Sequence, residues 1–244
     1  MRWAAVPVCC ALAAGPAAAD GIGLRAQFGE RTDRYGHNVL GGNEYAGISV
    51  AFAPEDGVER RFEVSLPDDR VIEDVALRLA DLTGDGVPEI VTVEASRAAG
   101  AELVVYGGLE AGALVKRAAT PPIGRPFRWL APAGIADFDG DGRLDVAYVE
   151  TPHLGGTLRI WTLSRGELIE LASATGFSNH RIGEPFITGG VRDCGSAPEL
   201  VLPNFGWTRL MAARLVGAEI TAERITDGLD LQDLPRHLAC GETQ

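Results

Sequence analysis

The chain has 244 residues, of which 46% are hydrophobic and 23% are charged, enough for one large all-β domain or two small ones with a substantial core. The formal net charge is −12, from 22 Lys and Arg against 34 Asp and Glu. No surplus of cations is therefore left to displace counterions from a phosphate backbone, which argues against a nucleic-acid partner. The 31 glycines in an ordinary apolar background indicate many tight turns.

Residues 1–19 predict a secretory signal peptide. Arg2 supplies a positive start, residues 3–14 are apolar apart from Pro7, and three alanines at 17–19 form a small-residue cleavage site. The run is too short to span a bilayer, and no later stretch reaches about 18 apolar residues. The alternative is a buried N-terminal helix. We therefore expect a periplasmic or secreted protein with no membrane span, whose single mature domain covers residues 20–244.

Removal of this segment leaves two cysteines, Cys194 and Cys240. Because an exported protein meets an oxidising compartment, we expect one disulfide between them, which would attach the C-terminal tail to the rest of the domain. A zinc site is the weaker alternative, since neither cysteine has a neighbour in a CxxC arrangement.

An internal repeat organises the rest of the chain. Residues 79–94 and 135–150 match closely at an offset of 56, and a further step of about 54 residues leads to residues 190–202, where 197–201 match 87–91. One step back from Asp81 leads to residues 27–42, which have turn residues without the acidic motif. A unit of about 55 residues therefore occurs roughly four times, which is typical of a propeller or a linear array.

Each unit contains short apolar or alternating segments that are separated by glycine-rich turns and predict β-strands. In chain order, the expected strands are residues 22–28, 46–52, 60–66, 89–94, 102–106, 114–117, 144–149, 157–163, 168–171, 199–203, 209–216 and 219–225. We expect an all-β, propeller-like array of about four blades, each of four antiparallel strands. Residues 22–28 are expected to complete the last blade and so close the ring.

Two acidic loops carry the strongest functional signal. Oxygen side chains occupy positions 1, 3, 5 and 9 of each loop, and glycines at positions 4 and 6 allow the loop to curl. Such sets suit Ca²⁺, which takes six to eight oxygen ligands in flexible geometry. Without a cation, the carboxylates would repel one another; the alternative is a pair of plain acidic turns. The expected ligands, with the backbone carbonyl at position 7, are Asp81, Thr83, Asp85, Val87 and Glu89, then Asp137, Asp139, Asp141, Arg143 and Asp145.

An EF-hand does not fit these loops, because Thr92 and Tyr148 stand where its last carboxylate is needed. The nine-residue pattern between two strands resembles the calcium loops of the FG-GAP/VCBS-repeat family, found in integrin α-subunit propellers and many bacterial secreted proteins. The resemblance covers two clear and two degraded repeats. It implies a β-propeller with structural Ca²⁺ in its strand-connecting loops, and a role in protein or carbohydrate contacts.

The equivalent third loop keeps Asp193 and Glu199 but offers too few oxygen ligands for a cation, and it contains Cys194. We expect the disulfide to Cys240 to hold together the turn that lacks an ion.

Polar and bulky residues precede the acidic loops in several units. In a propeller, equivalent positions converge near the central channel, where such side chains would hold a small ligand or a glycan; the plainer interpretation is a set of solvated salt bridges between blades. These residues are Arg70, Asp74, Arg128, Trp129, His180 and Glu184. The four histidines show no metal-ligand spacing, and a shared zinc site is not favoured.

We therefore expect an exported, calcium-stabilised module that binds or scaffolds a protein or carbohydrate partner. The rival interpretation is an enzyme, such as a polysaccharide lyase or hydrolase, with its site in the central funnel. A third is a purely structural envelope protein. The sequence contains no GxSxG motif, P-loop or dinucleotide fingerprint.

Overall fold

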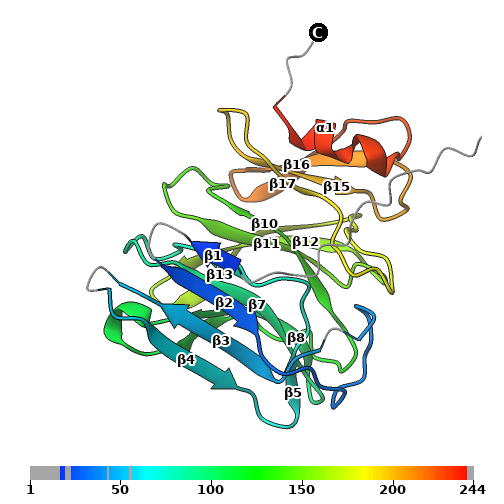
Figure 1. The fold of residues 1–244 in the computed structure, drawn as a ribbon. Helices are drawn as coiled ribbons and strands as arrows, with labels where there is room; N and C mark the ends of the chain where they lie inside the picture. Colours follow the sequence, from blue (N-terminus) through cyan, green and yellow to red (C-terminus); the bar gives the residue numbers. More distant parts are fainter. Residues whose placement is uncertain (1–16, 20–22, 43, 55–56, 241–244) are drawn as a thin grey trace, which may run out of the picture.

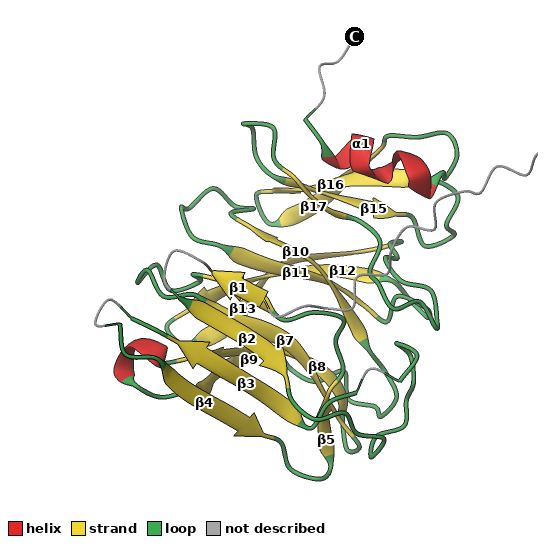
Figure 2. Ribbon diagram, viewed as in Figure 1, coloured by secondary structure: helices red, strands yellow, loops and turns green. Residues whose placement is uncertain are grey.

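The structure is a computed structural model that describes residues 17–19, 23–42, 44–54 and 57–240. Most of the predicted signal peptide, residues 1–16, lies outside these residues. The all-β prediction is confirmed, because the described chain forms four antiparallel sheets that follow one another along the sequence (Figures 1 and 2). In the first, third and fourth sheets consecutive strands pair as a meander, and the second sheet differs only in that β5 and β6 both pair with β7.

The first sheet contains β1 (Ala17–Ala19), β2 (Leu24–Phe28), β3 (Gly47–Phe52) and β4 (Arg60–Ser65). The second contains β5 (Arg70–Ile72), β6 (Arg78–Ala80), β7 (Glu89–Ser96), β8 (Gly100–Gly107) and β9 (Val115–Ala119), with both β5 and β6 paired to β7. The third contains β10 (Leu130–Ala136), β11 (Asp145–Glu150), β12 (Thr157–Ser164) and β13 (Glu167–Thr175). The fourth contains β14 (Gly190–Arg192), β15 (Glu199–Pro203), β16 (Leu210–Val216) and β17 (Glu219–Arg224).

The sequence pattern located the last three strands of every sheet but not the strands that precede them, which are β1, β5, β6, β10 and β14. These strands lack a clear apolar alternation: β5, β6 and β14 have three residues each, and β10 contains Pro132 and Gly134. The register of β10 against β11 shifts between these two residues. A short strand of this kind has little recognisable sequence pattern, because it is stabilised by pairing with a later strand and not by the β-propensity of its own residues.

The prediction that residues 22–28 close the ring is wrong. β2 pairs with β3 in the first sheet, with Leu24 opposite Phe52, and does not join the fourth sheet. The first and fourth sheets lie at opposite ends of the stack (Figure 1). The blades therefore form an open array.

Three hydrophobic clusters explain the open arrangement. Each of them joins two successive sheets: one lies between the first and second, one between the second and third, and one between the third and fourth. A closed ring would need a fourth cluster between the last sheet and the first, and the described residues contain none. Nearest-neighbour packing of this kind is how linear repeat arrays are stabilised.

The two ends of the array differ: one is a polar sheet face and the other carries a short helix. The outer face of the first sheet presents exposed polar side chains, including Arg25, Gln27, Arg61 and Glu63. At the other end, α1 (Leu234–Leu238) lies against β14. No helix in the described part of the chain is long and apolar enough to cross a membrane.

The first strand lies at the predicted cleavage site. Ala17–Ala19 pair antiparallel with Leu24–Ala26 of β2. Cleavage after Ala19 would remove β1 and leave β2 at the edge of the first sheet.

Candidate metal centre

The two acidic loops occupy equivalent places in successive sheets. Residues 81–88 connect β6 to β7, and residues 137–144 connect β10 to β11. Gly84, Gly86, Gly140 and Gly142 all have positive φ angles, between 75° and 88°, which other residues adopt only with strain. Both loops therefore curl in the same way, as the repeat predicts.

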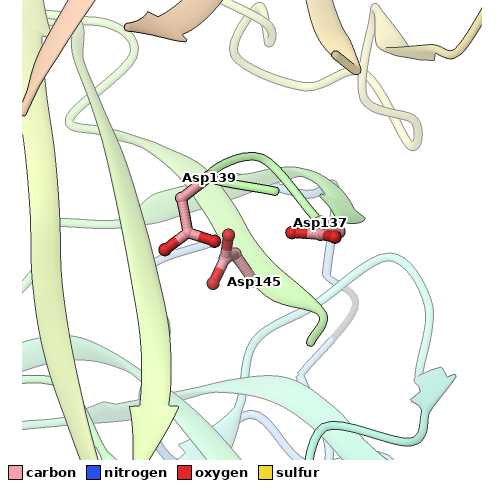
Figure 3. A group of neighbouring side chains, drawn as sticks. All are labelled: Asp137, Asp139 and Asp145. Atoms are coloured by element: carbon pink, nitrogen blue, oxygen red, sulfur yellow. The ribbon is translucent and has the colours of Figure 1, made fainter. Parts of the chain in front are cut away.

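The second loop brings three carboxylates together. Oxygen atoms of Asp137, Asp139 and Asp145 lie within 4.8 Å of one another, and Figure 3 shows the side chains of Asp139 and Asp145 close together. Backbone N–H groups fix part of this set, because Gly140 and Gly142 donate to Asp137 at 2.8 and 2.9 Å. The arrangement offers several oxygens to one small volume, which is the donor set that Ca²⁺ prefers.

Asp145 is the buried member of this group. Its side chain is inaccessible to solvent, and its Oδ2 accepts a hydrogen bond from the backbone N–H of Phe138 at 3.0 Å. Its Oδ1 is buried without a hydrogen bond of normal geometry, although the side chain of Thr162, opposite Asp145 on β12, acts to lower the pKa of this carboxyl. Burial, with the nearby charge of Asp139, raises the pKa of Asp145 to about 6. A buried carboxylate oxygen without a partner is costly unless a cation neutralises it.

The side chains of Asp141 and Arg143 pair with each other and are not part of the group formed by Asp137, Asp139 and Asp145. The guanidinium of Arg143 forms an ion pair with Asp141 at 2.5 Å, and Oδ1 of Asp141 accepts the backbone N–H of Arg143. The hydrogen bonds from Arg143 lower the pKa of Asp141. This carboxylate already has a cationic partner, so Asp145 is the more informative residue for testing the site.

In the first loop, backbone groups hold the carboxylates in similar positions. Asp81 accepts hydrogen bonds from the N–H groups of Gly84, Asp85 and Gly86 at 2.7–3.1 Å. Glu89 is buried at the end of the loop, and burial raises its pKa. Unlike Asp137, Asp139 and Asp145, the carboxylates of this loop do not form a group of three within 4.8 Å in the described structure.

Glu89 is held by the first half of its own loop. Its Oε2 accepts the N–H groups of Leu82 and Thr83 at 2.9 and 3.3 Å, and the Thr83 hydroxyl lies 3.3 Å from Oε1. Thr83, Asp85 and Val87 remain predicted ligands, and Oδ1 of Asp85 accepts the N–H of Val87.

In the third loop, where the acidic motif is incomplete, arginine side chains neutralise the carboxylate at the last position of the loop. Glu199 takes the place of Glu89 and Asp145 and forms ion pairs with Arg192 and Arg214 at 2.5 and 2.6 Å. Although burial acts in the opposite direction, hydrogen bonds from Arg214 and Arg192 lower its pKa. Two guanidinium groups thus neutralise this position.

The predicted disulfide is present in the same loop. Cys194 is bonded to Cys240, 46 residues later, and the bond attaches the segment after α1 to the turn between β14 and β15.

The match to a known family begins and ends at these loops. Residues 81–148 match the family model of the FG-GAP-like repeat, from the first residue of the first loop to β11, directly after the second. This segment is therefore similar to an FG-GAP-like repeat. FG-GAP-like repeats often bind calcium and usually take part in protein binding. No curated protein matches the chain.

Four of the six predicted funnel residues lie together. Arg128 and Trp129 line a cavity, the ring of Trp129 meets that of His180 at 4.8 Å, and Nε2 of His180 lies 2.8 Å from the carbonyl oxygen of Glu184. The indole N–H of Trp129 donates to the carbonyl of Glu73 at 2.7 Å.

Arg70 and Asp74 do not line this cavity. Arg70 forms ion pairs within the second sheet, and Asp74 is buried against Arg78 at 2.8 Å. Both side chains have structural partners instead.

The sequence pattern missed other residues of the cavity, notably His37, Phe127 and His153. These side chains come from three different loops, with no motif to relate them. The signal that was present is the occurrence of histidine and aromatic residues in loops, two of them within the first and third sheets and one between the second and third.

Acidification is expected to destabilise the protein through His153. Burial, together with the neighbouring His180 and His37, lowers the pKa of His153 from 6.5 to about 4. The unfolded chain therefore binds a proton that the folded chain does not, so this stability is complete above about pH 6.5 and is lost as the pH falls toward 4. Because the ring is only half-buried, we expect a loss of about 1–2 kcal/mol between about pH 7 and pH 5.

Urea unfolding of the parent and of His153→Gln at these two pH values checks this expectation. Glu73, whose pKa burial raises to about 7, acts in the opposite direction, but it is present in both proteins. The variant should lose less stability on acidification than the parent. Equal losses would contradict the assignment to His153.

Proposed function

We propose that the protein is an exported binding module whose loops at residues 81–89 and 137–145 hold Ca²⁺, and whose partner is a protein or a carbohydrate. The observation that carries the calcium assignment is the contrast among the three equivalent loops. Asp145 and Glu89 are buried carboxylates with raised pKa values, and Glu89 forms only a long ion pair with Arg117 at 4.0 Å, whereas Arg192 and Arg214 contact Glu199 at 2.5 and 2.6 Å at the same position. A cation in the first two loops would serve the purpose that the arginines serve in the third.

The ions would have a structural role. Both loops connect neighbouring strands of the two central sheets, β6 to β7 and β10 to β11, so a bound ion would fix each hairpin where the sheets stack. A rigid surface formed by several loops is a common platform for binding, because little conformational entropy is lost when a partner docks. The predicted signal peptide and the disulfide support export.

Calcium is expected to stabilise the protein against thermal unfolding. At a free concentration about 100-fold above the dissociation constant, one bound ion contributes about 2.7 kcal/mol, which raises the Tm of a domain of this size by about 5–10 °C. Scanning calorimetry with excess Ca²⁺, with Mg²⁺ and with a chelator measures this shift. Ca²⁺ should exceed Mg²⁺, which dislikes flexible cages of high coordination number.

Asp145→Asn provides the decisive variant. It removes a ligand and also removes a buried charge, so in chelator it should be at least as stable as the parent while its response to Ca²⁺ is reduced. Asp193→Asn, in the loop that two arginines neutralise, is the matched control and should keep the full response. If both variants respond like the parent, or if the parent gains nothing from Ca²⁺, the calcium proposal fails.

A further inference from the structure

A second site lies where four loops meet. The cavity holds about 290 Å³. One wall comes from the β2–β3 loop, one from the segment before β10, one from the β11–β12 loop and one from the β13–β14 loop. The lining includes His37, Phe127, Arg128, Thr151 and His153.

Backbone strain is concentrated around this cavity. Five non-glycine residues of the described chain have positive φ angles. Phe127 and Thr151, at 54° and 46°, line the cavity, and Asn38, at 55°, directly follows His37. For a β-branched threonine this conformation is a genuine outlier. Strain that the surrounding structure maintains is typical of ligand-binding positions.

Two buried carboxylates hold His37 in place. Glu44 is 2% exposed and accepts the backbone N–H groups of Gly36, His37 and Asn38 at 2.8–3.2 Å, which fixes the turn. Glu73 is 1% exposed, and its Oε1 lies 2.9 Å from Nδ1 of His37 in an ion-pair contact; neither carboxylate oxygen of Glu73 has a hydrogen-bond partner of normal geometry. Burial of two carboxylates is costly, and here it orients a single imidazole toward one edge of the cavity.

A chain of hydrogen bonds fixes a second imidazole. The carbonyl of Glu184 can only accept, so Nε2 of His180 carries the proton that it shares at 2.8 Å. In the neutral ring Nδ1 of His180 then accepts, and Nε2 of His153 donates to it at 2.9 Å. Nδ1 of neutral His153 is consequently a hydrogen-bond acceptor.

An aromatic surface faces these polar groups. The side chain of Phe127 is 45% exposed, and its ring lies 5.1 Å from that of Tyr35 and 5.7 Å from that of His37. The backbone N–H of Phe127 donates to the hydroxyl of Tyr35 at 2.7 Å, which holds the ring against the cavity. The walls are therefore apolar on one side and polar on another.

We infer that this cavity binds an uncharged sugar unit, such as the end of a glycan chain. The ring of Phe127 would pack against the C–H face of the sugar, and neutral His153 would accept a hydrogen bond from a hydroxyl group, while Arg128 and Thr151 supply donors. The lining also includes Val39, Leu154 and Ile182, and this largely apolar wall favours a ligand without charge.

This inference deepens the proposed binding function by choosing carbohydrate as the ligand class. It does not depend on calcium, because the cavity residues belong to neither acidic loop.

The test is a titration of the full chain in calcium buffer with the methyl glycosides of glucose, galactose, mannose and N-acetylglucosamine, followed through the histidine ring signals in NMR spectra. At least one glycoside should shift the signals of His153 and His180 saturably, with a Kd in the millimolar range. His237, which lies in α1, is an internal control and should not respond. The chain has four histidines, so each signal is assignable by substitution.

Phe127→Ala is expected to weaken this binding about tenfold, and Phe127→Tyr, which keeps the ring, should retain it. Phe205→Ala is the matched control, because Phe205 is 41% exposed and does not line the cavity. Absence of any shift up to about 100 mM glycoside, far above a millimolar Kd, overturns the inference, and so does binding that survives Phe127→Ala unchanged. A response to methyl glucuronide alone overturns the uncharged class. The calcium-dependent Tm is measured on the same samples, so failure of the sugar site and failure of the calcium proposal are distinguishable.

Discussion

Removal of the disulfide between Cys194 and Cys240 is expected to lower the free energy of unfolding by about 4 kcal/mol. The bond closes a loop with a sequence separation of 46, and the chain-entropy model assigns about that much stability to a loop of this length. For a domain of this size the Tm should fall by about 8–16 °C. Thermal unfolding of the double variant Cys194→Ser/Cys240→Ser measures the effect.

The loss should begin at the last sheet. α1 has five residues and no buried side chain, and its contacts with the sheet include a hydrogen bond from Arg192 to the carbonyl of His237 at 3.1 Å. So short a helix is not stable by itself. Hydrogen exchange of α1 and β14 should therefore accelerate first. A phosphine reductant should reproduce the loss in the parent and leave the double variant unchanged, whereas a double variant that melts like the parent would refute the expectation.

Replacement of Arg70 by methionine is expected to destabilise the protein by about 3 kcal/mol or more. Glu94 is fully buried and lies 2.8 Å from both Arg70 and Lys116, and the hydroxyl of Tyr106 also donates to it. Glu102 binds the same two cations. Removal of one cation leaves buried negative charge incompletely neutralised, which typically costs about 3–5 kcal/mol. Urea unfolding of Arg70→Met at neutral pH measures the loss.

The double variant Arg70→Met/Glu94→Gln separates lost charge from lost packing. It should recover part of the stability, because the uncompensated carboxylate has been removed. Glycoside binding at the cavity should be unchanged in Arg70→Met, since Arg70 does not line it. A variant as stable as the parent would show that Lys116 alone is sufficient to neutralise this network.

Stability and glycoside binding, measured on the same variants, distinguish structural from ligand-binding residues among the polar side chains that precede the acidic loops. Arg70 and Arg128 occupy comparable places in successive repeats, yet Arg70 is paired with carboxylates of its own sheet, whereas Arg128 lines the cavity. Repeat position alone did not separate these roles, because the neighbouring side chains come from different strands and loops.

The local pattern of the sequence was sufficient for the repeat, the acidic loops and the last three strands of each sheet. Glycines at fixed offsets and alternate carboxylates act within nine residues, so the shape of residues 137–145 is encoded where it occurs. The pairing of Cys194 with Cys240 also followed from the sequence, since only two cysteines remain after the predicted signal peptide.

Only the tertiary structure decided that the array is open and that a cavity forms across its loops. Ring closure depends on whether the first and last sheets present matching apolar faces. The first sheet presents Arg25 and Arg61, and α1 lies against β14 of the last sheet. The meeting of His37, Phe127 and His153 likewise requires three sheets to be stacked in order. Contacts between residues far apart along the chain leave no local pattern, because the packing of successive sheets creates them.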